Sequence, residues 1–318
     1  MNKKTVTLLV IATSFLLIGC IVFGGVMMTL NWDLSELSTV KYEINEYEIT
    51  DSFQKILINT DTADITLVPS DTISVVCTER VNAKHTVSVK DGILRIEIVD
   101  YTKWYERIGF DFSTSKITVY VPQGQYEMLK IKGSTGDVKI PENYQFERVD
   151  IHQSTGDVTC KASTTETMKI KTSTGSIHVE NVSVGHLELI VTTGKIMATD
   201  VNCRGDMNVS VSTGKTNLTN ISCKNLTTDG NTGDITLKNV VTAEKLSIER
   251  STGYVKFEGC DAAEIYVKTD TGDVTGTLMS EKVFLCKTHT GSVNVPKTTS
   301  GGLCEITTDT GDIRLTID

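Results

Sequence analysis

From residue 126 to residue 318, the chain repeats one pattern of apolar and polar positions. Counted from a recurring glycine, positions −7, −5, +2 and +4 are apolar; around Gly136 they are Leu129, Ile131, Val138 and Ile140. The residues between them are mostly Lys, Glu, Thr, Ser and Asp. Alternation of this kind is typical of a half-buried strand. Each unit is therefore predicted to be two strands joined at a corner, with one face of each strand in a core.

A Thr-Gly dipeptide marks each corner. Glycine tolerates the positive φ of a sharp corner, and threonine, being β-branched, stacks well on copies of itself and can hydrogen-bond along the stack. Successive corner glycines are 19 or 20 residues apart, an interval that is typical of a solenoid. The ten corner glycines are Gly136, Gly156, Gly175, Gly194, Gly214, Gly233, Gly253, Gly272, Gly291 and Gly311.

A second corner follows the second strand of each unit, where Asn, Asp or Gly at +6 precedes an apolar residue at +7. One 20-residue unit, or rung, then buries about five apolar side chains, a gross gain of roughly 8–15 kcal/mol. Ordering its backbone costs roughly 20–40 kcal/mol, so a rung cannot fold unless it stacks on others. Thr-Gly is a poor hairpin turn, and inward residues that repeat in register favour parallel stacking. We predict an all-β fold, a parallel β-solenoid (β-helix) of about 20-residue rungs.

The first thirty residues predict a membrane anchor. Lys3 and Lys4 precede a largely apolar run over 6–30, long enough for one transmembrane helix. The lysines place the N-terminus in the cytoplasm, so we expect a single-pass protein of the cell membrane with an extracellular C-terminal domain. The sequence LIGC resembles a bacterial lipobox, and the alternative is a lipoprotein signal that ends at Cys20. The apolar run continues after Cys20, which favours the uncleaved helix.

Four segments follow from these patterns. Residues 1–30 are the anchor, and the polar, acidic residues 31–49 are a juxtamembrane spacer. Residues 50–125 contain irregular N-terminal β rungs, in which Ala63 stands where a corner glycine would be. Residues 126–318 form the regular Thr-Gly solenoid.

An aromatic segment from Tyr101 to Phe112 interrupts the alternation and is predicted as a loop inserted into a rung. Four of its residues form the candidate binding patch, because exposed aromatic rings can stack on a sugar or face a membrane. A packed loop is the other interpretation. The patch consists of Tyr101, Trp104, Tyr105 and Phe110.

Composition narrows the choice of partners. The net charge is −9 and the pI is about 5.2, whereas nucleic-acid binding needs a basic stripe, so nucleic acid is excluded. The eight cysteines show no CxxC and no zinc-like spacing, and we expect small buried hydrophobic residues. Cys203 and Cys223 each lie nine residues after a corner glycine, so a disulfide between stacked rungs is the alternative to two free thiols.

Acidic residues recur at the corners, but no catalytic residue, cofactor or metal site is predicted. Aspartates on solenoid corners can bind calcium, yet calcium-binding nonapeptide repeats use a denser GGxGxD pattern. In other units the position after the corner glycine is Ser, Lys or Tyr. We therefore expect the corner aspartates to be solvated turn residues. The five histidines are scattered, and no carboxylate cluster with a base stands out. The corner aspartates are Asp137, Asp157, Asp234, Asp273 and Asp312 at +1, and Asp270 and Asp309 at −2.

Three stretches resemble the DUF4097 family of bacterial envelope proteins, often described as putative adhesins. They are ITVYVP at 117–122, LKIKGSTGDVKI at 129–140 and ILINTDTADITLVPS at 56–70, the last similar to the family's usual opening. The resemblance covers about residues 50–318. It implies a membrane-tethered β-solenoid at the cell surface, and some relatives are encoded with envelope-stress systems. The family has no established catalytic residues that could be carried over.

Three functions from different classes follow. We predict a non-enzymatic, membrane-anchored surface protein, adhesin-like or associated with envelope stress, that binds or scaffolds an unknown protein or envelope polymer. The first alternative is a carbohydrate-active β-helix enzyme such as a polysaccharide lyase, which a single lateral cleft lined by Asp, Arg or Lys would favour. The second is a self-assembling structural module. The chain ends directly after the strand pattern 313–317, and an uncapped edge invites pairing.

Overall fold

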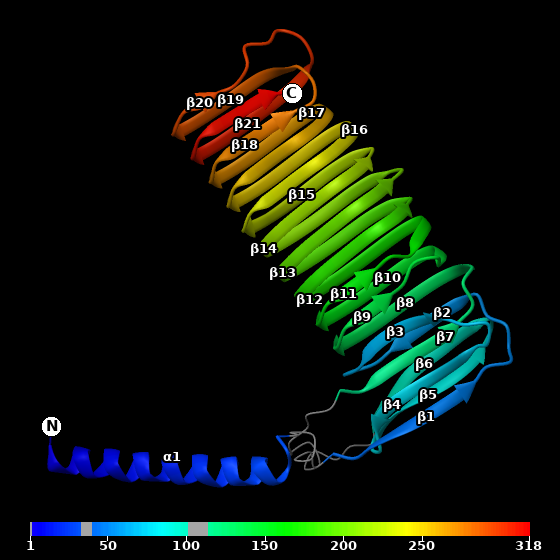
Figure 1. The fold of residues 1–318 in the computed structure, drawn as a ribbon. Coiled ribbons are helices and arrows are strands. Elements are labelled where there is room, and N and C mark those ends of the chain that lie inside the picture. Colours follow the sequence, from blue (N-terminus) through cyan, green and yellow to red (C-terminus); the bar gives the residue numbers. More distant parts are fainter. Residues whose placement is uncertain (1, 33–39, 101–113) are drawn as a thin grey trace.

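The computed structural model describes residues 2–32, 40–100 and 114–318, which form one helix and 22 strands (Figure 1). Helix α1 (Lys3–Thr29) is 27 residues long. By length and composition it can cross a membrane, and its apolar surface is not covered by the rest of the described chain. The strands stack into the predicted parallel β-solenoid, which confirms the fold class.

The middle of the solenoid follows the order of the chain. Each strand pairs in parallel with the equivalent strand one rung later, and the corner residues align: Thr174 lies beside Thr193, and Gly175 beside Gly194. Several strands run through a corner without a break. The strands of this part are β8 (Gln125–Thr135), β9 (Val138–Ile140), β10 (Gln145–Thr155), β11 (Val158–Cys160), β12 (Ser163–Val184), β13 (His186–Cys203), β14 (Asp206–Cys223), β15 (Asn225–Thr232), β16 (Ile235–Thr252), β17 (Val255–Thr271) and β18 (Val274–Leu278).

The apolar positions of the repeat form one continuous core. Leu129, Ile131, Val138 and Ile140 are at most 1% exposed. The apolar +7 residues from Val182 to Cys260 are at most 2% exposed, whereas Met279 at the same position is 53% exposed. The predicted periodicity therefore places the side chains correctly. The unit around Gly291 differs, because its +2 residue Val293 is 45% exposed. That unit lies at the end of the stack, where no further rung covers it.

Two kinds of tight corner allow the rungs to stack closely. Gly194 has a φ of 146°, and a Cβ there would overlap the carbonyl group of Gly175 in the adjacent rung. Glycine is needed both for the backbone angle and for the close approach. At the second corner, Asn220 has a φ of 54°, and its side-chain amide donates to Asp200 one rung earlier, at 2.7 Å. Asn and Asp tolerate this left-handed conformation, which explains their recurrence at +6.

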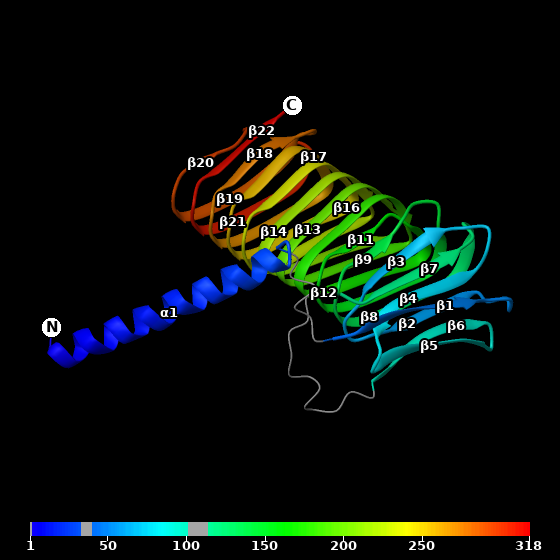
Figure 2. The same cartoon turned by 60° about the horizontal axis from the view of Figure 1, so that its bottom comes forward.

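The N-terminal strands cap one end of the solenoid, and their order in space differs from their order in the chain. Strands β2 and β3 lie between β8–β9 and β6–β7, in parallel pairing. Beyond them the pairing becomes antiparallel, β4 with β1 and β7, and β5 with β6 (Figure 2). The strands are β1 (Tyr42–Glu48), β2 (Lys55–Asn59), β3 (Asp64–Pro69), β4 (Ser74–Arg80), β5 (Ala83–Lys90), β6 (Ile93–Asp100) and β7 (Lys116–Val121).

The segment 31–49 was expected to be a spacer, and this is corrected in part. Strand β1 occupies residues 42–48 and pairs along its whole length with β4. Its alternating pattern is weak, because Glu43 and Glu46 interrupt it. The partner strand, which only the tertiary structure supplies, stabilises it.

The last two rungs are exchanged in space. Strand β21 pairs with β17 on one side and with β19 on the other, and β22 lies in the same way between β18 and β20. The terminal strand is therefore β19, and the expectation that residues 313–317 form the open edge is wrong. The loop over 295–301 is long enough for the chain to pass the end of the stack and return inside it. The strands are β19 (Lys282–Thr290), β20 (Val293–Asn294), β21 (Gly302–Thr310) and β22 (Ile313–Ile317).

The corner geometry predicts the effect of adding one methyl group. Gly194→Ala should lower the free energy of unfolding by at least about 2 kcal/mol, because it combines an unfavourable φ with overlap against backbone. Gly124→Ala is the matched control: nothing lies within 4 Å of its Cβ position, and we expect a change within about 0.5 kcal/mol. Denaturant unfolding of the two variants would measure both values. Equal stabilities would contradict close stacking at the corner.

Candidate functional site

The aromatic patch predicted from the sequence is not tested by the structure. Tyr101, Trp104, Tyr105 and Phe110 lie outside the described residues. Their chain neighbours are the end of β6 and the start of β7, which belong to the same rung at the capped end. The patch stays a prediction.

The corner aspartates at +1 hydrogen-bond to the backbone of the adjacent rung. The carboxylate of Asp137 accepts a hydrogen bond from the backbone N–H of Asp157 at 2.9 Å, and that of Asp157 accepts from Ser176 at 2.7 Å. Asp234 does the same for Tyr254, and Asp312 for Ser292. Hydrogen bonds from Ser292 lower the pKa of Asp312. Each aspartate therefore satisfies a backbone donor of the next rung, which accounts for its place at +1 without a bound cation.

Position −3, three residues before each corner glycine, is where the solenoid departs from its repeat. Most rungs carry Thr or Val there, facing inward. In two places a glycine is followed one rung later by a long polar side chain: Gln153 fills the space above Gly133, and Arg250 fills the space above Gly230. The signal was present in the sequence as Gly then Gln, and Gly then Arg, at one register position. Position −3 is not among the apolar positions predicted for the core, so neither pair was predicted as a site.

Arg250 is 3% exposed and carries an incomplete set of hydrogen bonds. Its Nη1 donates to the carbonyl of Val211, two rungs away, at 2.7 Å. Its Nε and Nη2 have no partner among the described residues. Burial lowers the pKa of the guanidinium group, and the charges of Asp229 and Asp234 partly oppose that effect. Unpaired buried donors are costly, and among the described buried side chains with an unpaired polar atom Arg250 is the one that carries a charge.

A lateral groove of about 350 Å³ opens beside Arg250. It runs over four successive rungs, along the strands that precede the corners at Gly214, Gly233, Gly253 and Gly272. Its lining is mostly polar and holds both signs of charge, so it suits a ligand with several hydrogen-bonding groups rather than an apolar one. The lining residues are Ser212, Asp229, Gly230, Asn231, Glu249, Arg250, Ser251, Lys268 and Asp270.

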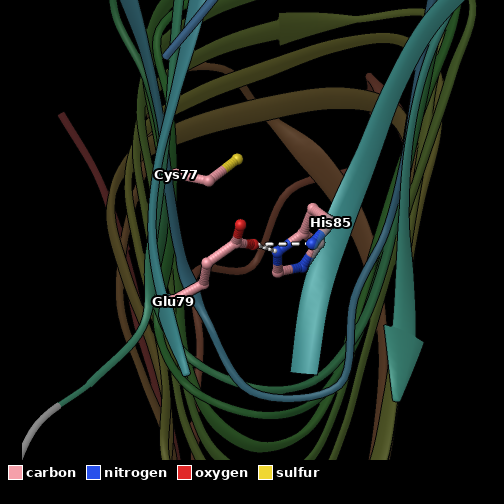
Figure 3. Close-up of side chains that lie close together, drawn as sticks. All are labelled: Cys77, Glu79 and His85. Atoms are coloured by element: carbon pink, nitrogen blue, oxygen red, sulfur yellow. Dashed lines mark hydrogen bonds and ion pairs between the residues drawn. The ribbon is translucent and has the colours of Figure 1, made fainter. Parts of the chain in front are cut away.

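A second polar cluster is buried in the N-terminal cap (Figure 3). Cys77 and Glu79 point inward from β4, and His85 faces them from β5. The Nδ1 of His85 lies 2.7 Å from Oε2 of Glu79, and the backbone N–H of His85 donates to the same oxygen at 2.6 Å. One potential ligand atom of each of the three side chains lies within 4.8 Å of the others.

Two outer residues complete this cluster. Asn45 on β1 donates from Nδ2 to Oε1 of Glu79 at 2.7 Å, and Oγ1 of Thr60 lies 2.9 Å from Nε2 of His85. Burial and the nearby Glu79 raise the pKa of the Cys77 thiol to about 12. The cluster was not predicted from the sequence, because its members are spaced as ordinary alternating strand residues and only the hairpin between β4 and β5 brings them together.

Five of the other seven cysteines are buried as small hydrophobic residues, whereas Cys286 on β19 is half-buried and Cys20 in α1 is exposed. All eight are free, including Cys203 and Cys223, so the alternative of a disulfide between rungs is not realised. The Cys203 thiol donates weakly to backbone carbonyl groups such as that of Asp206. Burial raises the pKa of Cys160 and of Cys223 to about 12, which leaves both as unreactive thiols at neutral pH.

Comparison with known proteins gives one family and several structures. The model of the Toastrack family DUF4097 matches residues 53–208 and 202–318. A putative adhesin from Parabacteroides distasonis is 12% identical, with a TM-score of 0.46, over 87% of this chain and 98% of that one. A putative lipid binding protein from the same organism is 16% identical, with a TM-score of 0.47, over 75% and 95%. A putative adhesin from Bacteroides fragilis is 15% identical, with a TM-score of 0.43, over 87% and 97%. No curated protein matches the chain.

The thiols give a direct test of two alternatives. We expect the denatured, unreduced full-length protein to titrate eight thiols with an aromatic disulfide reagent, since all eight cysteines are free. A disulfide between Cys203 and Cys223 would leave six, and lipidation at Cys20 would leave seven. Titration after reduction is the control, and the intact mass separates lipidation from partial oxidation.

Proposed function

Because the chain belongs to the DUF4097 (Toastrack) family, we propose that it is a non-enzymatic protein of the bacterial cell surface, anchored in the membrane by α1. The observation that carries this proposal is the pairing of an exposed apolar helix with a repeating solenoid that bears a polar lateral groove. Twenty-seven helical residues span about 40 Å, enough for a hydrocarbon core of about 30 Å. With Lys3 and Lys4 in the cytoplasm, the solenoid lies outside.

The apolar residues that follow Cys20 support an uncleaved anchor. Helix α1 runs through Cys20 without a break and continues to Thr29. A lipoprotein cut before Cys20 would keep only the last third of this helix, which is too short to cross a membrane. The full helix gives the simpler attachment and leaves the solenoid on the same side.

The groove beside Arg250 is the proposed binding face. Its carboxylates accept hydrogen bonds, Lys268 donates them, and Ser and Asn side chains do both. Such a lining fits a partner rich in hydroxyl or amide groups, as an envelope polymer or a protein loop would be. The mixed charges disfavour a purely anionic or purely cationic partner.

The groove also meets the criterion set for a polysaccharide lyase, because it is lined by Asp, Arg and Lys. Two observations favour binding over catalysis. The Arg250 guanidinium is buried and bonded to the backbone, so it cannot approach a substrate proton. Among the described residues, the only group of three His, Cys, Asp or Glu side chains with ligand atoms within 4.8 Å is Cys77, Glu79 and His85, so the groove carboxylates do not converge.

Crosslinking in intact cells tests location and groove together. Asn231→Cys places a reactive thiol in the groove, and Lys238→Cys places one on another exposed face of the same rung. A membrane-impermeant thiol-directed photocrosslinker should label both variants, because both sites are outside the cell. Only Asn231→Cys should yield a discrete crosslinked partner, and adding Lys268→Gln should reduce that yield.

The outcomes separate the parts of the proposal. Failure to label either variant in intact cells contradicts the outer location. Equal crosslinking from both sites contradicts the groove as the binding face. Release of unsaturated oligosaccharides from an acidic polysaccharide by the purified protein would support the lyase instead.

Self-association is a second candidate, and the exposed terminal strand favours it. Among the described strands, β19 pairs in register only with β21, so its outer edge is open. Val283 and Leu285 on this strand are 40% and 60% exposed. Antiparallel pairing with a second copy, centred on Leu285, would set Phe284 against Cys286 of that copy and continue the core. The edge strand β1 at the other end carries Glu43, Glu46 and Glu48, charges of the kind that protect an edge.

A charge on β19 should abolish this pairing. We expect full-length protein in detergent to sediment as a dimer, and Leu285→Lys to sediment as a monomer. Tyr254→Lys is the control, since Tyr254 is 60% exposed in the middle of the solenoid and should leave the dimer intact. A wild-type protein that stays monomeric at high concentration rules this candidate out.

A further inference from the structure

We propose that Cys77, Glu79 and His85 form a binding site for one zinc ion in the N-terminal cap. The side chains are 0%, 0% and 2% exposed, so the ion would be enclosed by protein. This zinc site is independent of the groove beside Arg250 and of the partner proposed to bind there. It assigns chemistry to the one cluster of sulfur, oxygen and nitrogen ligands that the described residues bring together.

The backbone places the three ligands on one side of a hairpin. Cys77 and Glu79 are two residues apart on β4 and therefore share a face, and β5 returns antiparallel so that His85 meets them. Zinc binds thiolate sulfur at about 2.3 Å and imidazole nitrogen or carboxylate oxygen at about 2.0–2.2 Å, which sets ligand atoms roughly 3–4 Å apart. The observed separations bracket that range: Nδ1 of His85 lies 2.7 Å from Oε2 of Glu79, and the three ligand atoms all lie within 4.8 Å of one another.

Hydrogen bonds with Thr60 and Asn45 orient two of the three ligands, as is common in metal sites. A zinc-bound imidazole commonly donates its other N–H to a fixed acceptor, and Nε2 of His85 faces Oγ1 of Thr60 at 2.9 Å. Ligating carboxylates are held in the same way, and Oε1 of Glu79 is held by Asn45. Both groups are thus aimed before any ion arrives, which reduces the cost of ordering them.

Charge balance favours an ion of charge +2 at this place. A thiolate and a carboxylate neutralise Zn²⁺, and the neutral imidazole completes a site with no net charge, as burial requires. On binding, the Cys77 thiol proton leaves to solvent, and the Nδ1 proton shared with Glu79 leaves or moves to Nε2. A water molecule can take the fourth position, as it does in zinc sites with three protein ligands.

The site would tie the cap together. Strand β4 carries two ligands and pairs with both β1 and β7, while β5 carries the third and pairs with β6. An ion bound here links the two strands that close the end of the solenoid. Because the ion binds the folded cap, it raises the apparent stability as its concentration exceeds its Kd.

The test uses full-length protein in detergent, stripped with a chelator and titrated with Zn²⁺ against a chromophoric competitor. We expect one zinc per chain. Cys77→Ser and His85→Gln should weaken binding at least about 100-fold, and Thr60→Val about 10–100-fold through loss of imidazole orientation. Cys160→Ser is the matched control, because Cys160 is an equally buried thiol on β11, outside the cluster.

Cobalt provides a readout that needs no variant. Co²⁺ in the wild-type protein should give a thiolate-to-cobalt charge-transfer band and intense tetrahedral visible absorption. The proposal is overturned if the wild-type protein gives no such band and competes for no zinc. It is overturned equally if folded Cys77→Ser, judged by circular dichroism, binds zinc as tightly as the wild type.

Discussion

Parallel backbone pairing at the Thr-Gly corner is the constraint on which the rest of this structure depends. The N–H of a corner glycine donates to the carbonyl of the neighbouring rung's threonine, for example that of Gly156 to Thr174 at 2.9 Å. This brings the corners so close that no Cβ fits between them. The next N–H is satisfied by the corner aspartate of the adjacent rung, and the second corner is held by Asn and Asp side chains. Register, side-chain direction and core composition all follow from that stacking.

Function is expected where this constraint is relaxed. A rung that matches its neighbours offers a uniform surface, whereas a glycine at position −3 removes a side chain and opens the stack to the rung beside it. At Gly133 the space is filled by Gln153, which bonds the carbonyl of Gly136 at 2.7 Å. At Gly230 the space is occupied by the side chain of Arg250, and a groove lined by charged residues lies beside it. Glycine at position −3 is therefore followed by a packed side chain at Gly133 and by a groove open to the surface at Gly230.

The hydrophobic core is covered in different ways at the two ends of the solenoid. At the N-terminal end, antiparallel strands β4 and β5 fold over the last rung and enclose a polar cluster. At the other end, the final rung of the chain is inserted beneath β19, whose apolar side chains remain exposed. One end is thereby suited to closure by hydrogen bonds or an ion, and the other to pairing with another strand.

The sequence by itself determined the period, the inward positions, the corner residues and the apolar N-terminal helix, because each depends on local geometry repeated many times. It could not show the exchange of β19 and β21, since rungs with the same inward pattern can stack in either order. Nor could it show the cluster of Cys77, Glu79 and His85, or the reach of Arg250 to Val211, two rungs away. Those features depend on which strands become neighbours, and only the tertiary structure decides that.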